Sequence, residues 1–140
     1  MRCGILRADL VLVHKHRREL LLLCGNSVIR TYRIALGPQP AGPKQQEGDG
    51  RTPEGRYTID WRNPNSKYHL SLHISYPDAA DRARAVAAGI DPGKDIMIHG
   101  QPNGESRTGD WTQGCIAVTN AEMEEIWGLV FDGTPIVIEA

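Results

Sequence analysis

Short apolar runs separated by turn residues constrain the fold of this chain more than any other feature. Runs rich in valine and leucine occupy Ala8 to Val13 and Glu19 to Cys24, with the charged segment His14 to Arg18 between them. The pair Gly25-Asn26 tolerates the positive φ of a tight hairpin turn, and Ser27 to Leu36 then alternates apolar and polar residues. We therefore expect the chain to open as a β-meander.

Further strands and two short helices are expected after this meander. The helices carry capping signals: Asp78 opens an alanine-rich segment that Gly89 ends, and Thr119 with Glu122 forms a capping box before an amphipathic segment. The remaining predicted strands are Tyr57 to Asp60, Ser71 to Tyr76, Asp95 to Ile98 and Pro135 to Glu139.

Length and charge limit the classes of protein to which the chain can belong. At 140 residues it suits one domain spanning 1–140, and we expect a monomer. The 16 basic and 17 acidic residues are interleaved, so neither nucleic acid nor an anionic membrane is an expected partner. Nor does the chain contain an apolar run of 18 residues, and charges interrupt its N-terminal apolar pieces. We expect no membrane span and recognise no export signal.

The histidines and cysteines outside the central region are expected to be structural. Three cysteines are an odd number, so at least one thiol is unpaired unless it bonds another chain. Cys24 lies in an apolar run and is expected in the core, whereas Cys3 lies near the terminus and gives no signal. His14 and His16 could share a strand face as metal ligands, but with no third ligand a solvated turn is favoured.

The segment Ile96 to Asn120 carries the residues best suited to chemistry. His99 and Cys115 lie at the two ends of a glycine-rich loop, where a fold-back would place an imidazole base beside a thiol nucleophile. The carbonyl of Gly100 could fix the tautomer of the imidazole. A sharp turn at Gly114 would expose backbone N–H groups of Gln113, Gly114 or Cys115 as an oxyanion hole. The alternative is a buried structural thiol with an unrelated loop histidine.

Other candidate ligand-binding residues lie outside this segment. Gly37 to Asp49 is a long proline- and glycine-rich loop, which is as consistent with a functional loop as with a surface excursion. Arg51 and Tyr57 follow it in a turn cluster and could face a ligand. His73 lies in a predicted strand, where a structural role is more common than a role in a site.

Four segments together resemble a known family. In order, the chain contains GDGRTPEGRY at 48–57, SLHISYPDAAD at 71–81, IHG at 98–100 and DWTQGCIA at 110–117. This combination resembles the L,D-transpeptidase catalytic domain, also called the YkuD domain, and in particular its murein L,D-transpeptidase branch. The resemblance covers roughly residues 8–139 and implies a mainly β sandwich or barrel with two short helices and the site at its mouth.

The resemblance also implies a reaction and a set of residues. Cys115 would be the nucleophile, His99 its base, and the Gly100 carbonyl the group that orients His99. Trp111 and Thr112, in the matching segment, become candidate substrate-binding residues. Cys115 would attack the carbonyl of the third residue of a peptidoglycan tetrapeptide stem, release D-alanine, and pass the acyl group to an amine of a second stem or of a wall-anchored protein. No metal or organic cofactor is implied.

Two departures from the family pattern concern substrate recognition. Many members have histidine before the Gly-Cys pair and arginine two residues after the cysteine, where this chain has Gln113 and Ala117. Arg33, Arg51 and Arg107 are candidates to replace the missing guanidinium. Two rival functions stay open: a hydrolase that resolves the same thioester with water, and a wall-binding module without catalysis. The family setting would be the cell envelope or periplasm, with roles in wall biogenesis and cell shape.

Overall fold

The N-terminal apolar runs form the antiparallel strands that the sequence predicts. In the computed structural model, which describes residues 7–140, these are β1 (Leu10–His14), β2 (Glu19–Cys24) and β3 (Ser27–Arg33). Burial alternates along β2, so that Leu20 and Leu22 face the interior and the residues between them do not. Cys24 is also buried, as predicted, whereas the Cys3 prediction lies outside the described residues.

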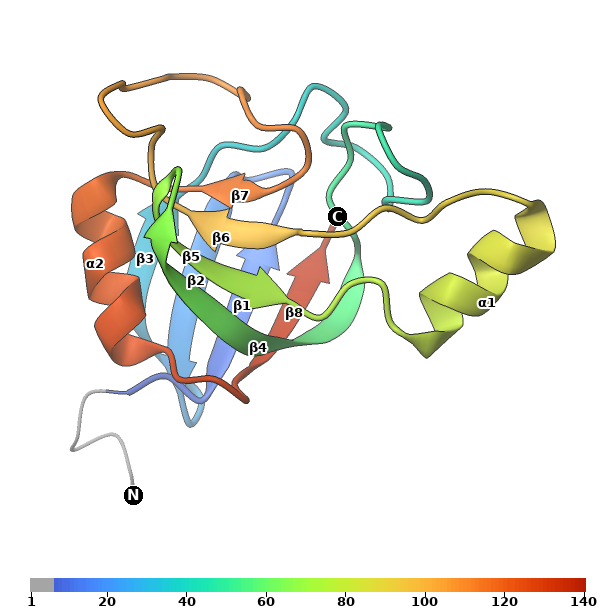
Figure 1. The fold of residues 1–140 in the computed structure, drawn as a ribbon. Coiled ribbons are helices and arrows are strands. Elements are labelled where there is room, and N and C mark those ends of the chain that lie inside the picture. Colours follow the sequence, from blue (N-terminus) through green and yellow to red (C-terminus); the bar gives the residue numbers. More distant parts are fainter. Residues whose placement is uncertain (1–6) are drawn as a thin grey trace.

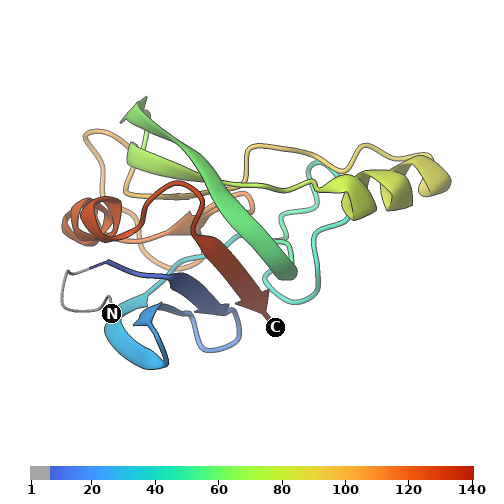
Figure 2. The same cartoon turned by 90° about the horizontal axis from the view of Figure 1, so that it is seen from below.

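The strands form one mixed sheet in the order β3-β2-β1-β8-β4-β5-β6-β7 (Figure 1). The other five strands are β4 (Gly55–Ser66), β5 (His69–Ile74), β6 (Met97–His99), β7 (Ile116–Ala117) and β8 (Pro135–Glu139). Most pairs are antiparallel, but β1–β8 and β6–β7 are parallel. Figure 2 shows β1 to β3 in one layer and β4 with β5 in the other. The mainly β fold of the prediction is confirmed.

The two edges of the sheet meet at one point. Ala35, just after β3, and Ala117 in β7 exchange two backbone hydrogen bonds of 2.9 and 3.0 Å. This bridge joins the first strand of the sheet to the last, so the sheet curls toward a closed barrel. Because β7 carries the residue after Cys115, the bridge also anchors the candidate site to the opposite edge.

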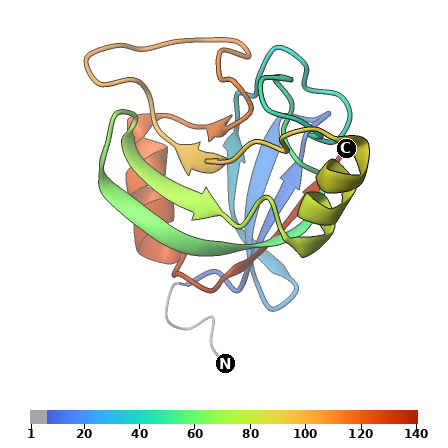
Figure 3. The ribbon, with the colours of Figure 1, turned by 45° about the vertical axis from the view of Figure 1, so that its right-hand side comes forward.

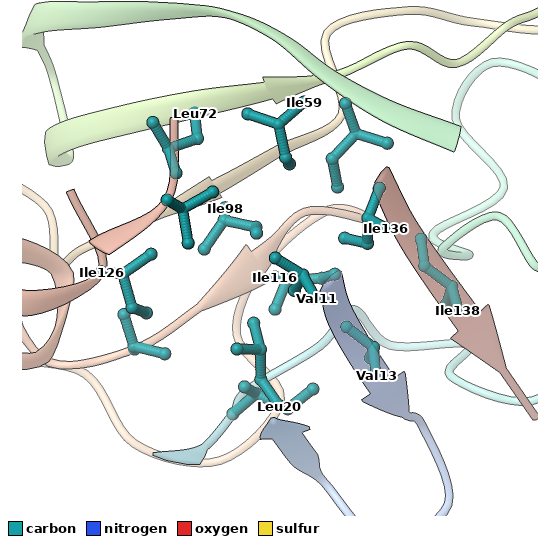
Figure 4. Packing of buried hydrophobic residues seen from close by; sticks show 14 of the residues in the cluster. Val11, Val13, Leu20, Ile59, Leu72, Ile98, Ile116, Ile126, Ile136 and Ile138 are labelled. Atoms are coloured by element: carbon teal, nitrogen blue, oxygen red, sulfur yellow. The ribbon is translucent and has the colours of Figure 1, made fainter. Parts of the chain in front are cut away.

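Branched aliphatic side chains from both layers fill the interior (Figure 4). The side chains of Ile59, Leu72, Ile98, Ile116 and Ile136 are all completely buried. Each such side chain removed from water stabilises the fold by roughly 1.5–3 kcal/mol before entropy is counted. The site is therefore attached to a rigid scaffold.

Both predicted helices form, and both begin with the predicted cap. Helix α1 (Ala79–Ala88) starts at Asp78 in a capping box with Asp81, and helix α2 (Asn120–Leu129) starts at Thr119 in a capping box with Glu122. Helix α2 packs against the sheet, whereas α1 stands apart at the end of two extended segments (Figures 1 and 3). Neither helix in the described part of the chain is long and apolar enough to cross a membrane.

The largest differences from the prediction are in β4, β3 and β7. Strand β4 runs to Ser66, six residues beyond the predicted end, because the polar segment after Asp60 pairs with β5 as an exposed ribbon with two register shifts. Strand β3 ends at Arg33 rather than Leu36, since the chain turns there to reach Ala117. The two-residue strand β7 is absent from the prediction.

Candidate functional site

Parallel pairing of β6 with β7 places the candidate base and nucleophile on one face of the sheet. Ile98 lies opposite Ile116, and His99 lies opposite Ala117. Side chains alternate along a strand, so Ile98 and Ile116 enter the core while His99, and Cys115 just before β7, occupy the other face. Both residues line one cavity of about 460 Å³.

The imidazole of His99 is buried and held by its neighbours. Its Nδ1 lies 2.7 Å from the carbonyl oxygen of Gly100. A carbonyl can only accept, so Nδ1 carries the proton and Nε2 keeps the lone pair. The ring of Tyr68 stacks on the imidazole at 4.3 Å, and Trp111 lies 5.6 Å away. Burial lowers the pKa of His99, which favours the neutral base.

The thiol of Cys115 rests on backbone atoms that lead into β6. Its Sγ accepts the N–H of Met97 at 3.4 Å and donates to the carbonyl of Asp95 at 3.4 Å. Burial raises the pKa of Cys115, the Asp95 carboxylate adds to the effect, and the Met97 N–H opposes it. The resting pair is therefore a neutral thiol with a neutral imidazole.

The loop before Cys115 is held by side-chain hydrogen bonds. Thr112 donates from Oγ1 to the carbonyl of Cys115 at 2.7 Å, and its own N–H donates to the carbonyl of Leu36 at 3.0 Å. Thr52 donates to the carbonyl of Gly114 at 2.7 Å. Thr112, a predicted substrate-binding residue, therefore lines the cavity mainly as a clamp on the nucleophile loop.

Glycine is required at position 114. Its φ is +132°, and a Cβ there would lie 2.7 Å from the carbonyl oxygen of Arg51. The N–H of Gly114 donates to Thr112 Oγ1 at 3.2 Å. Within residues 7–140, by contrast, the N–H groups of Gln113 and Cys115 have no hydrogen-bond acceptor. Gln113 and Cys115 are thus better placed than Gly114 to be the resting oxyanion donors.

The long loop of the prediction forms one wall of the cavity. Residues from 38–50 line it together with Gln113, Trp111 and Arg107, and Figure 1 shows both loops over the same end of the sheet. Lys44 is buried in this wall with its Nζ 2.9 Å from Asp49 Oδ1. The loop is therefore part of the site rather than a surface excursion.

Three predicted ligand-binding residues do not line this cavity. Tyr57 is a core residue whose hydroxyl donates to Asp81 at 2.8 Å. His73 binds Asp60 at 2.6 Å and stacks on Trp61, away from the cavity lining. The backbone carbonyl of Arg51 packs beside Gly114, while its guanidinium lies against Gly42. A single sequence cannot distinguish these positions from site positions, because the strand partners decide which face is open.

Tyr68 is a site residue that sequence reasoning missed. It lies in the turn between β4 and β5, is 38% exposed, lines the cavity and stacks on His99. A lone tyrosine in a polar turn gives no signal of its own. A further contact positions its turn: the N–H of Gly100 donates to the Tyr68 carbonyl at 2.9 Å, beside the base.

The histidines of the first turn have ordinary partners or exposure. His14 lies 3.1 Å from Glu139, and His16 is exposed. Across residues 7–140, no group of three or more histidine, cysteine, aspartate and glutamate side chains is arranged to hold a metal ion.

Comparison with known proteins gives the family of this chain. Residues 8–138 match the L,D-transpeptidase catalytic domain, YkuD. The chain belongs to the L,D-transpeptidase family. It is 35% identical over 106 residues to YafK of Escherichia coli strain K12, which is named as a candidate L,D-transpeptidase. The aligned residues make up 74% of this chain and 37% of YafK.

Other relatives extend the similarity along the chain. YqjB of Bacillus subtilis, also named as a candidate L,D-transpeptidase, is 29% identical over 132 residues, covering 91% of this chain and 69% of that protein. Among solved structures, the helical cell shape determining protein Pgp2 of Campylobacter jejuni matches with a TM-score of 0.71 and 26% identity. That match covers 93% of this chain and 46% of Pgp2, so the chain spans less than half of Pgp2 and of YafK.

Proposed function

We propose that this L,D-transpeptidase family member transfers acyl groups on peptidoglycan stem peptides through a thioester at Cys115. One observation carries the proposal: His99, held by Gly100 as the Nδ1–H tautomer, lines the same cavity as the free thiol of Cys115. A base with a fixed tautomer beside an accessible thiol is the arrangement that acyl transfer requires. The cell wall is the proposed setting, and Pgp2 is itself named for helical cell shape.

The neutral resting pair defines the order of proton movement. The Cys115 sulfur leaves the Asp95 carbonyl, its proton passes to Nε2 of His99, and a bond forms between sulfur and the substrate carbonyl carbon. His99 then returns the proton to the leaving nitrogen of D-alanine as the carbon–nitrogen bond breaks. Because both groups are uncharged at rest, proton transfer accompanies attack rather than preceding it.

Backbone donors would stabilise the oxyanion that forms during attack. The free N–H groups of Gln113 and Cys115 belong to the turn that carries the thiol, and Thr112 holds that turn through the carbonyl of Cys115. Prearranged donors of this kind typically contribute roughly 10²–10³ in rate each. Trp111 and Tyr68 flank His99 and would cover the imidazolium while the intermediate forms.

Hydrolysis of the thioester is a second candidate function. Gln113 is exposed beside the only partly buried Cys115, so water can approach the acyl group. The same enzyme would then trim stems or release a wall-anchored protein. The two reactions differ only in the group that accepts the acyl chain, which is an amine in transfer and water in hydrolysis.

Intact-mass analysis after incubation with a carbapenem tests the shared step. We expect one covalent adduct on the wild-type protein, none on Cys115→Ala, and a much slower adduct on His99→Ala. Val86→Ala, an exposed change on α1, serves as the control. If Cys115 reacts with a small alkylating reagent but never with the carbapenem, its chemistry is changed or absent, and the wall-binding alternative becomes the leading function.

Product analysis separates transfer from hydrolysis. The protein is incubated with a tetrapeptide stem, with and without an added amine acceptor, and the products are weighed. A cross-linked product that grows with acceptor concentration supports the transpeptidase. A tripeptide as sole product at every acceptor concentration supports the hydrolase.

A further inference from the structure

A second cavity adjoins the one that holds Cys115. Its volume is about 790 Å³, and its lining shares Trp111 and Arg107 with the Cys115 cavity. Its wall is formed by the end of β3 and by β7, where Ala35 and Ala117 bridge. A ligand in this space would therefore contact Trp111 and Arg107, two residues that also line the cavity of the thiol.

Unpaired positive charge distinguishes this second cavity. Four arginines and two acids line it, but both acids are engaged: Asp110 binds Arg18 at 2.7 and 3.1 Å, and Glu122 accepts the N–H of Thr119 in its capping box. In the described chain, Arg17 and Arg33 make no hydrogen bond or ion pair with a carboxylate. Glu19 pairs with Arg33 across the strands in register, yet forms no ion pair with it.

A buried donor and a small side chain complete the arrangement. The Nε1 of Trp111 is shielded from solvent and lacks a hydrogen-bond partner. An unsatisfied buried donor is costly, which points to an acceptor supplied by a ligand. Ala117 also lines the cavity, and its methyl group leaves open the space that a longer side chain would fill. Of the three arginines that could replace a guanidinium at this position, Arg33 and Arg107 line the cavity and Arg51 does not.

We infer that this cavity binds the carboxylate-bearing peptide that receives the acyl group, with Arg33 and Arg17 as its recognition residues. The inference rests on the proposed function, because it assigns the second substrate of the same thiol. Guanidinium groups bind carboxylates through two parallel hydrogen bonds, so two free arginines suit a peptide with more than one carboxylate. Its amine would attack the thioester carbon and lose a proton to Nε2 of His99, forming a carbon–nitrogen bond as the carbon–sulfur bond breaks. His99 would then pass that proton to the departing sulfur, which restores the thiol of Cys115.

The variant Arg33→Ala tests whether the second cavity binds the acceptor without affecting acylation at Cys115. The exposed Arg33 contributes little to folding, and Arg56→Ala, an exposed arginine on β4 outside both cavities, is the matched control. We expect unchanged carbapenem acylation at Cys115 and a roughly tenfold rise in KM for a stem-peptide acceptor, the effect of losing a charge-assisted hydrogen bond. An acceptor with amidated carboxylates should bind weakly to the wild type and show no further loss in Arg33→Ala.

Binding to Cys115→Ala measures the cavity without turnover. Calorimetry with the same acceptor peptide should give a weaker affinity when Arg33→Ala is added, and no change when Arg56→Ala is added. Equal affinity in all three proteins would overturn the assignment. Slower acylation of Arg33→Ala with an unchanged KM for the acceptor would also overturn it, because the cavity would then bind the donor peptide. Failure of acylation in the wild type would instead count against the proposed function, and the binding result would still decide the cavity.

Discussion

The two faces of the β6–β7 pair carry different tasks although their residues alternate in sequence. Ile98 and Ile116 enter the core with no solvent exposure, whereas His99 and Cys115 line a cavity on the other side of the same strands. Neighbouring positions thus divide into one set that stabilises the fold and another that carries the proposed chemistry. A one-residue change of register would exchange the two sets, so the parallel pairing of these short strands is essential to both.

This division explains why polar, buried groups are tolerated at the site. His99 is only 4% exposed and would be a costly core residue, but Gly100 satisfies its Nδ1 and the ring of Tyr68 stacks on the imidazole. The core face has no such polar group and gains its stability from close packing alone. Substitutions on the two faces should therefore fail in different measurements.

Removing the base should have the largest effect, and on chemistry. For His99→Ala we expect Cys115 acylation to slow by roughly 10²–10⁴, because no neutral imidazole is left to take the thiol proton. The free energy of unfolding should fall by less than about 2 kcal/mol. Carbapenem acylation followed by mass, with urea unfolding of the same protein, checks both values. A fall in unfolding free energy as large as the rise in the activation free energy for acylation would show that the two faces do not act separately.

The neighbouring core position should give the opposite result. Ile98→Ala leaves a cavity among fully buried side chains, and we expect a loss of about 2–5 kcal/mol in unfolding free energy. The acylation rate per folded molecule should stay within about threefold of the wild type, since His99 keeps its backbone partners. Val86→Ala, at 81% exposure, is the aliphatic control and should change stability by under about 0.5 kcal/mol.

Gly114 connects the two faces, so its substitution should affect both moderately. A Cβ at position 114 would lie 2.7 Å from the carbonyl oxygen of Arg51, and the residue would have to keep a φ of +132°. A non-glycine residue in such a strained conformation typically costs about 1–3 kcal/mol. Relief of that strain would displace the Cys115 turn, and we expect a roughly tenfold or greater loss of acylation. Gly128→Ala in α2, where a Cβ meets nothing within 4 Å, is the control and should leave acylation unchanged. An active Gly114→Ala protein would show that the turn geometry is not critical.

Local signals in the sequence predicted more of the fold than of the site. The Asp78 and Thr119 capping boxes were predictable because every partner lies within three residues. Strand β7 was not, since two residues have no periodicity and the pairing with β6 joins positions far apart in the chain. Tyr57 illustrates the same limit at the site: its strand was predicted, but whether its ring faced a ligand or Asp81 depended on packing from α1. His99 and Cys115 were predicted from their places on a glycine-rich loop and again from the resemblance to the family, and the geometry around them added Tyr68 and Lys44 to the cavity lining.

The smallest effect should appear in the pH dependence of stability. Burial lowers the pKa of His99 below its ordinary value of 6.5, so the unfolded chain binds a proton at this residue more readily than the folded chain. The contribution of His99 is thus fully present above about pH 6.5 and is lost as pH falls through the lower pKa of the folded state. In His99→Gln this contribution is absent, while the carboxylate contacts of His69 with Glu124 and of His73 with Asp60 are present in both proteins. Urea unfolding of wild type and variant between pH 7.5 and 5 should show the wild type losing more stability toward acid. Parallel curves would mean that His99 titrates equally in the folded and unfolded states, and that burial does not keep this base neutral.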